Sequence, residues 1–172
     1  MRIKKPLLIA FIGPVGSGKT NVANILAKRV KAVHINTDAL RVTLRAQGKS
    51  VSRAISLARR LWKKNLVHGN SVIADFDAVL PRRQKELLAL AKKFGAKFFL
   101  IKMRVPEKLI LKRLRTRHYT KRDLFPHARE AIRIYFIRKK FHQRRLKNRP
   151  HFVINNAKPL GAQIQKIINK IT

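Results

Sequence analysis

The sequence predicts a three-layer α/β fold, in which helices cover both faces of a five-stranded parallel sheet, together with a short lid. Two observations lead to this class. Short apolar runs alternate with helical patterns along the chain, an order that is typical of parallel sheets. Hydrophobic residues make up 45% of the 172 residues, which is enough for the core of a single domain spanning 1–172.

The expected strands are short, nearly continuous apolar runs, as in strands that are buried on both faces. They cover residues 7–12, 32–36, 71–75, 97–103 and 152–155. Between them apolar residues recur at helical spacing, and Pro81 and Gly95 mark the start and the end of one helix. The expected helices cover 19–30, 38–47, 50–68, 81–94, 106–117, 127–148 and 160–171, and the expected lid covers 113–126.

The segment after the first strand is a complete Walker A sequence, which identifies a P-loop NTPase fold. Its glycines allow the backbone to wrap so that amide groups point at nucleotide phosphates, and the next helix adds its positive N-terminal dipole. Lys19 is expected to reach the β- and γ-phosphates of ATP, and the Thr20 hydroxyl to bind Mg²⁺. A chance glycine turn is the alternative, which the flanking strand and helix disfavour. The expected nucleotide-binding residues are Gly13, Pro14, Val15, Gly16, Ser17, Gly18, Lys19 and Thr20.

Three of the seven acidic residues lie at the ends of two predicted strands. Ligands of an open parallel sheet bind at the carboxyl ends of its strands, so these side chains are candidates for a site. Asp75 is expected to hold Mg²⁺ through water, with a helix or turn cap as the alternative. Asp77 could take the same role or belong to a turn.

Asp38 and Arg41 are three residues apart near the start of a predicted helix and therefore share one face. A carboxylate there could accept the proton of an acceptor hydroxyl, so Asp38 is a candidate catalytic base. Arg41 could hold an anionic part of that acceptor. The alternative is ordinary helix capping by Asp38 beside a solvated arginine.

Arg113 and Arg117 are four residues apart at the start of the predicted lid. Phosphoryl transfer builds negative charge on the transferred group, and arginines on a closing segment could stabilise it. We therefore expect both to be catalytic. The alternative is a solvated basic face, because basic residues occur throughout this chain.

The net charge is +35, from 42 Lys and Arg against 7 Asp and Glu. Such a charge predicts attraction to a polyanion, although a compositional bias would produce it as well. The predicted helix 127–148 carries basic residues at helical spacing, which could follow nucleic-acid phosphates or form a solvated face. These residues are Arg129, Arg133, Lys140 and Arg144.

The composition also excludes several classes of protein. Because there is no cysteine, a disulfide scaffold, a zinc ribbon and a thiol nucleophile are excluded, and the six histidines show no metal-ligand spacing. No metal other than Mg²⁺ is expected. No apolar stretch reaches the roughly 20 residues of a membrane span, and no cleavage site follows the first apolar run, so we expect a cytoplasmic protein.

These motifs resemble the small P-loop kinases of the adenylate-kinase-like group. Within it, the chain looks most like the phage-type polynucleotide 5′-hydroxyl kinases and the zeta-toxin-like and antibiotic-phosphotransferase ATPases. The resemblance covers 7–117 well and the last third in outline. It implies that Asp38 is the general base, that Arg41 contacts the acceptor phosphate, and that Arg113 and Arg117 belong to a lid over ATP. The family usually has threonine and asparagine after the aspartate that matches Asp75, whereas this chain has Phe76 and Asp77.

We therefore expect a kinase that binds ATP with Mg²⁺ and transfers the γ-phosphoryl group to a hydroxyl. The 5′-hydroxyl of RNA or DNA is the preferred acceptor. The alternatives are a kinase of a small molecule, such as a sugar, a nucleotide-sugar or an antibiotic, and a nucleic-acid-binding ATPase without kinase activity.

Overall fold

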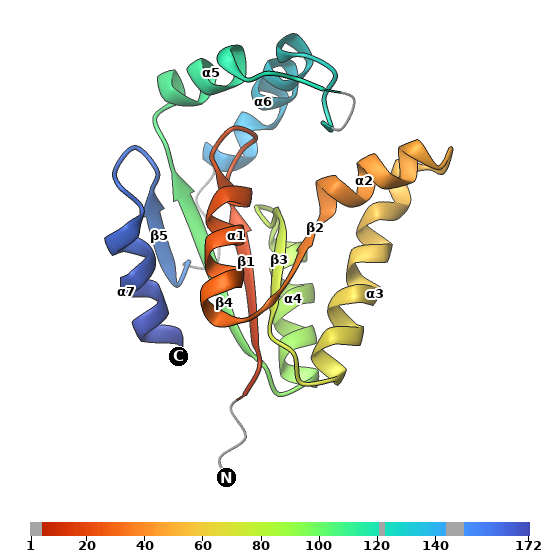
Figure 1. The fold of residues 1–172 in the computed structure, drawn as a ribbon, viewed down its shortest axis with the longest axis vertical. Helices are drawn as coiled ribbons and strands as arrows, with labels where there is room; N and C mark the ends of the chain where they lie inside the picture. The colour runs from red at the N-terminus through yellow and green to blue at the C-terminus, as the bar shows by residue number, and fades with distance from the viewer. Residues whose placement is uncertain (1–4, 121–122, 144–149) are drawn as a thin grey trace.

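The computed structural model describes residues 5–120, 123–143 and 150–172. Five parallel strands form one sheet in the order β2-β3-β1-β4-β5, which confirms the predicted class (Figure 1). The strands are β1 (Leu7–Ile12), β2 (Val33–Asn36), β3 (Val72–Asp77), β4 (Lys97–Arg104) and β5 (Phe152–Asn155). The helices are α1 (Lys19–Val30), α2 (Thr37–Ala46), α3 (Ala54–Val67), α4 (Pro81–Lys93), α5 (Glu107–Thr116), α6 (Ala128–Gln143) and α7 (Gly161–Ile171).

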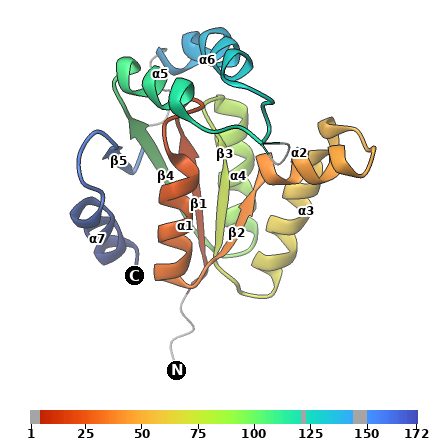
Figure 2. The same ribbon diagram turned by 45° about the horizontal axis from the view of Figure 1, so that its top comes forward.

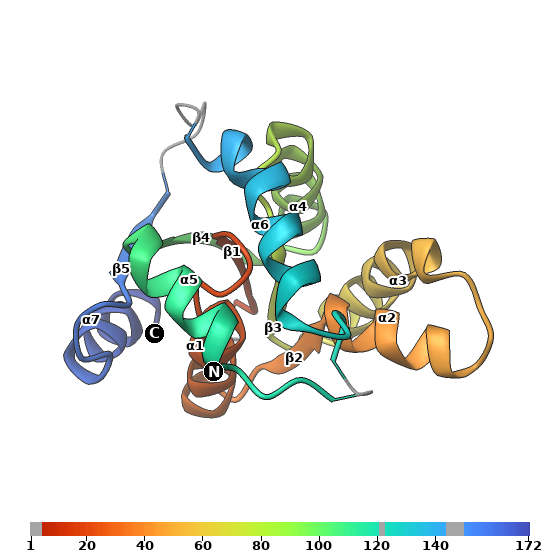
Figure 3. The same cartoon turned by 90° about the horizontal axis from the view of Figure 1, so that it is seen from above.

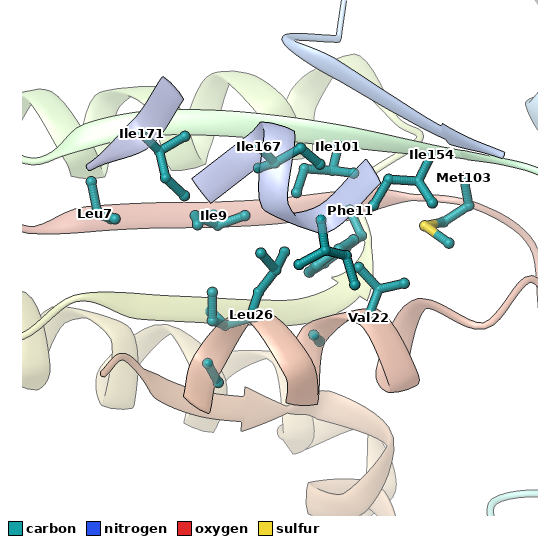
Figure 4. Packing of buried hydrophobic residues seen from close by; sticks show 14 residues of the cluster. Leu7, Ile9, Phe11, Val22, Leu26, Ile101, Met103, Ile154, Ile167 and Ile171 are labelled. Atoms are coloured by element: carbon teal, nitrogen blue, oxygen red, sulfur yellow. The ribbon is translucent and has the colours of Figure 1, made fainter. Parts of the chain in front are cut away.

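Apolar side chains fill the space on both sides of the sheet. Strand β1 lies in the middle, and its alternate residues point to opposite faces, as the period of a strand requires. On one face Ile9 and Phe11 pack with side chains of α1 and α7 (Figure 4). On the other face Leu8 and Ala10 pack with side chains of α3 and α4, including Trp62. The sheet is therefore the middle of three layers.

Helices α5 and α6 lie across the carboxyl ends of the strands, where ligands of such sheets bind (Figures 1 and 2). They pack against each other through a separate apolar cluster that includes Leu114 and Tyr135. Seen from above, these two helices lie over the sheet, while α2 and α3 lie on the opposite side of it from α7 (Figure 3). The carboxyl edge is thus covered by α5 and α6 and flanked by α2.

Three element boundaries differ from the prediction in ways that affect the site. The expected helix 50–68 is a short 3₁₀ turn, Val51–Arg53, followed by α3. Strand β3 continues to Asp77, so Asp75 lies inside the strand. The expected basic helix 127–148 is seen as α6 up to Gln143, and its remainder, with Arg144, lies outside the described residues.

No helix in the described part of the chain is long and apolar enough to cross a membrane.

Candidate functional site

The Walker A loop joins β1 to α1 and has the backbone conformation that its glycines allow. Gly16 and Gly18 have φ angles of +79° and +86°, a region that side chains disfavour. The Asn156 side chain, which follows β5, donates to the Ser17 carbonyl at 2.7 Å and is buried. A Cβ on Gly18 would lie 2.1 Å from Asn156 Nδ2, so any other residue there would force the Asn156 side chain to move. The loop is therefore fixed by a residue from the far end of the sequence.

Lys19 lies at the start of α1, and its ammonium group folds back over the loop. Its Nζ donates to the carbonyl oxygens of Gly13 at 2.6 Å and Pro14 at 3.0 Å. The positive charge is thereby held beside the loop, where the phosphates of a nucleotide would bind.

Asp75 lies in β3 and is buried, with 4% of its surface exposed. Its Oδ2 lies 3.0 Å from His34 Nε2 and accepts from Asn36 Nδ2 at 2.6 Å. Asn36 Nδ2 also donates to the Thr20 hydroxyl at 3.3 Å, so a chain of polar contacts joins Asp75 to the Walker A threonine. Sequence analysis assigned no such role to His34 or Asn36, because the contacts cross between strands.

The residues around Asp75 and Thr20 fit Mg²⁺. This ion usually takes one or two protein oxygens and completes its shell with water and substrate phosphates. A hydroxyl and a carboxylate line one cleft here, and within the described ranges no group of three or more His, Cys, Asp or Glu side chains could hold a metal ion. The hydroxyl of Thr20 and the carboxylate of Asp75 therefore fit a Mg²⁺ ion that would bind together with a nucleotide.

Asp77, the other candidate for the Mg²⁺ side, also has partners within the protein. Its Oδ1 accepts from the Gly13 amide at 3.3 Å, and its Oδ2 lies 3.2 Å from Arg138 Nη2 and 3.0 Å from His142 Nε2. Burial raises the pKa of Asp77, but the contact with His142 and the charges of Lys19, His142 and Arg138 outweigh it and lower the pKa overall. Asp77 thus ties α6 to the start of the phosphate loop. Both carboxylates line the cleft, and the assignment of Asp75 rather than Asp77 to Mg²⁺ stays a prediction.

Asp38 and Arg41 meet on the first turns of α2, where Arg41 donates to the Asp38 carboxylate. Helix α2 begins at Thr37 because the Asn36 side chain caps it, accepting from the Ala39 amide at 2.8 Å. The cap is therefore Asn36, and Asp38 is not needed for capping. Asp38 is 59% exposed in its side chain and lines the cleft together with Arg41.

The two predicted lid arginines both line the cleft. Arg113 Nη2 donates to the Asn156 carbonyl at 2.8 Å, while its Nη1 is buried and has no hydrogen-bond partner in the described structure. Arg117 pairs with Asp123 and lies over the Tyr119 ring, 5.5 Å from its centroid. The segment after α5 thus holds Arg117 by local contacts.

Arg45 connects that same segment to α2. Its guanidinium donates to the carbonyl oxygens of Asp123 at 2.7 Å and Leu124 at 3.2 Å. The predicted lid 113–126 is therefore attached near its end to α2, the helix that carries Asp38. Its first residues, 113–116, belong to α5, and residues 121–122 lie outside the described structure.

These side chains surround a single cleft of about 420 Å³, a volume typical of small-molecule sites. It extends from the Walker A loop to α2 and α4 and brings together residues from seven helices and strands. Its charged and polar lining consists of Lys19, Thr20, Asp38, Arg41, Asp75, Asp77, Arg83, Arg113, Arg117 and Arg138. Arg83 and Arg138 are residues that sequence analysis did not assign to the site.

The basic helix α6 uses several of its cations in contacts within the protein. Arg133 donates to Glu130 at 2.8 Å, Arg138 to Asp77 at 3.2 Å, and Lys139 lies 2.6 Å from Glu107. Arg133, one of the basic residues predicted to follow nucleic-acid phosphates, therefore already has a carboxylate partner within α6.

With this geometry in place, comparisons with known proteins identify the family. Residues 8–134 match the family described as AAA domain, which is more than half of the chain. The chain belongs to the AAA domain family. No curated protein is significantly similar to it in sequence.

Solved structures share the fold of this AAA domain at low sequence identity. The APS kinase of Mycobacterium tuberculosis, in complex with AMPPNP and APS, superposes with a TM-score of 0.63 at 20% identity, covering 96% of each chain. A gluconokinase from Sinorhizobium meliloti 1021 gives 0.61 at 16% identity, covering 98% of this chain and 93% of its own. Shikimate kinase from Aquifex aeolicus vf5 gives 0.54 at 16% identity, covering 96% of each chain.

The comparisons confirm the coarser part of the predicted resemblance, a P-loop kinase fold. They give no specific support to polynucleotide kinases or zeta toxins. The roles of individual residues of this AAA domain stay predictions.

Proposed function

We propose that this protein is an ATP- and Mg²⁺-dependent kinase that phosphorylates a hydroxyl group of a small molecule. The observation that carries the proposal is the single cleft that joins the Walker A loop and Asp75 to Asp38 and Arg41. Phosphoryl transfer needs a phosphate cradle, charge neutralisation and a positioned nucleophile, and residues suited to each lie around this space.

In the proposed reaction, the amides of the Walker A loop and Lys19 bind the β- and γ-phosphates of ATP. Thr20 would hold Mg²⁺ directly and Asp75 through water, and the ion, when bound, neutralises phosphate charge. The acceptor oxygen forms a bond to the γ-phosphorus while the bond to the bridging oxygen breaks, and ADP leaves. Asp38 accepts the hydroxyl proton, and Arg113 and Arg117 stabilise the charge on the transferred group.

Two observations favour a small acceptor over our sequence-based preference, the 5′-hydroxyl of a polynucleotide. The cleft holds about 420 Å³ and is bounded by α2 on one side and by α5 and α6 on another, so it suits a compact molecule. In addition, the solved structures named above are, by their titles, kinases of APS, gluconate and shikimate. For nucleic acid as the acceptor, the supporting observation is the net charge of +35.

The test measures ADP release and phosphorylated product with a panel of small hydroxyl compounds and 5′-hydroxyl oligonucleotides. The variant Asp38→Asn keeps the shape of the side chain and removes the base, so transfer should fall about a hundredfold or more while ATP affinity barely changes. Glu130→Gln is the matched control, because it neutralises a carboxylate of α6 that pairs with Arg133 and does not line the cleft.

Equal transfer rates in the wild type and Asp38→Asn would remove Asp38 from the mechanism. Hydrolysis that nucleic acid stimulates, without transfer to any acceptor, would favour the ATPase alternative. Preferential transfer to oligonucleotides would restore the polynucleotide acceptor.

A further inference from the structure

Arg83 is a cation of the cleft whose charge is incompletely neutralised. It lies in the first turn of α4, and only 22% of its side chain is exposed. Its Nη1 is buried and has no hydrogen-bond partner among the residues that the structure describes. The closest carboxylate oxygen, from Glu86, is 3.6 Å away, beyond hydrogen-bond distance. Arg83 lines the cleft, so an anion bound there would lie beside a guanidinium whose charge Glu86 neutralises only in part.

Glu86 cannot neutralise Arg83 by itself, because three arginines share this carboxylate. Arg59 holds it most closely, donating at 2.7 Å, whereas Arg82 is 3.8 Å away and largely exposed. Burial lowers the pKa of Arg83, and the charges of Arg59 and Arg82 lower it further, while the charge of Glu86 and its contact with the guanidinium raise it. The surroundings of Arg83 therefore carry an excess of positive charge.

The cleft between Arg83 and the catalytic candidates has a partly apolar wall. Ile55 of α3, Phe76 of β3 and Leu80, just before α4, line the same cleft as Arg83 and Asp38. Phe76 packs against Trp62 with ring centroids 5.2 Å apart, which fixes its ring. A molecule bound here would meet apolar surface beside a cation.

We propose that Arg83 binds an anionic substituent of the acceptor and so orients the acceptor hydroxyl toward Asp38. This inference rests on the proposed function and specifies its substrate class. The acceptor would be a small hydroxyl compound that carries a phosphate, sulfate or carboxylate group on an apolar or planar body, and not a neutral polyol. Arg41 on α2 already has the Asp38 carboxylate as a close partner, whereas the carboxylate nearest to Arg83 is 3.6 Å away.

Arg82 provides a matched control for the test. It is the neighbouring residue, contacts the same Glu86, and is 76% exposed, but it does not line the cleft. Arg83→Gln and Arg82→Gln therefore remove the same charge from the same helix turn. Arg83→Lys keeps the charge and loses the planar pair of donors, so it tests the site even if Arg83→Gln folds poorly.

The first measurement is a binding titration of protein saturated with AMPPNP, so that the Walker A loop is filled. The probes are inorganic phosphate, sulfate and acetate, which distinguish the possible anionic groups. We expect at least one probe to bind the wild type and Arg82→Gln alike, with at least tenfold weaker binding to Arg83→Gln and an intermediate loss for Arg83→Lys. Equal affinities in Arg83→Gln and Arg82→Gln, or no binding of any probe to the wild type, would overturn the proposal.

The second measurement separates this inference from the proposed function. With an anionic acceptor, Arg83→Gln should raise KM at least tenfold and leave the affinity for ATP unchanged. Phosphorylation of neutral acceptors only, at equal rates in Arg83→Gln and Arg82→Gln, would refute the anion site and leave the kinase intact. Anion binding that depends on Arg83, without transfer to any acceptor, would refute the kinase and leave the anion site intact.

Discussion

Replacing Gly18 with alanine should destabilise the protein far more than a glycine-to-alanine change in a loop usually does. The φ angle of +86° alone costs an alanine about 1–2 kcal/mol. The new Cβ would also lie 2.1 Å from Asn156 Nδ2, so the Asn156 side chain must move and lose its 2.7 Å hydrogen bond to the Ser17 carbonyl. Leaving that buried acceptor unsatisfied costs about 1–3 kcal/mol, which makes the expected total about 2–5 kcal/mol.

The free energy of unfolding can be measured by urea titration with the fluorescence of Trp62, the only tryptophan. Gly48→Ala is the control for backbone strain, because Gly48 has a φ of +66° and open space where its Cβ would lie. Gly48→Ala should lower the free energy of unfolding only by the cost of the positive φ angle, about 1–2 kcal/mol. The difference between the two variants then measures the clash with Asn156.

A double-mutant cycle locates the clash. In an Asn156→Ala background the amide that the Cβ would meet is absent, so the cost of Gly18→Ala should fall to that of Gly48→Ala. If Gly18→Ala costs no more than Gly48→Ala, or costs the same with and without Asn156, then the Walker A loop is not braced by the segment after β5.

Two further predictions concern Lys19 and Asp77. Lys19→Ala should lower phosphoryl transfer by about a thousandfold or more, while the urea midpoint of the variant stays near that of the wild type. Lys28→Ala, at an exposed lysine, is the control. Full activity of Lys19→Ala would refute the Walker A assignment. Because the pKa of Asp77 is lowered in the folded protein, the stability it contributes is present above its ordinary pKa of 3.8 and is lost as the pH falls through the lower folded value. Asp77→Asn should therefore be less stable than the wild type near neutral pH, and the difference in unfolding free energy should shrink below about pH 4. A difference that stays constant from pH 7 to pH 2.5 would refute the assigned contacts.

The parts of the site that the sequence could predict are those encoded within a few consecutive residues. The Walker A loop is one continuous segment, and the Asp38–Arg41 pair follows from a spacing of three residues on a helix. Contacts between distant segments left no such signal. Asn156 braces a loop 139 residues earlier in the chain, and His142 contacts Asp77 from a helix on the other side of the site.

The different contacts of Asp75 and Asp77 show why strand periodicity was insufficient to place these two side chains. Two residues apart on a regular strand, both side chains would face the same way. The pairing of β3 with β1 shifts its register after Ala74, which pairs with Ala10, so that Phe11 pairs with Asp77. This irregularity brings Asp77 beside Gly13 while Asp75 faces Asn36 of β2. A register shift of this kind depends on the neighbouring strands and cannot be read from one segment.

The distribution of the acidic residues bears on what the charge of +35 means. Each of the seven carboxylates contacts a basic side chain: Asp38 with Arg41, Asp75 with His34, Asp77 with Arg138 and His142, Glu86 with Arg59, Glu107 with Lys139, Asp123 with Arg117, and Glu130 with Arg133. The remaining cations far outnumber them, so the whole surface attracts anions and net charge alone cannot select a partner. Selection requires donors that are held in place and lack a partner inside the protein. In the described structure, Nη1 of Arg83 and Nη1 of Arg113 have no hydrogen-bond partner, although Glu86 lies 3.6 Å from Arg83, and both residues line the cleft. The placement of these two groups, one beside the Walker A loop and one on α4, therefore favours a phosphate donor and an anionic small acceptor more strongly than the overall charge favours nucleic acid.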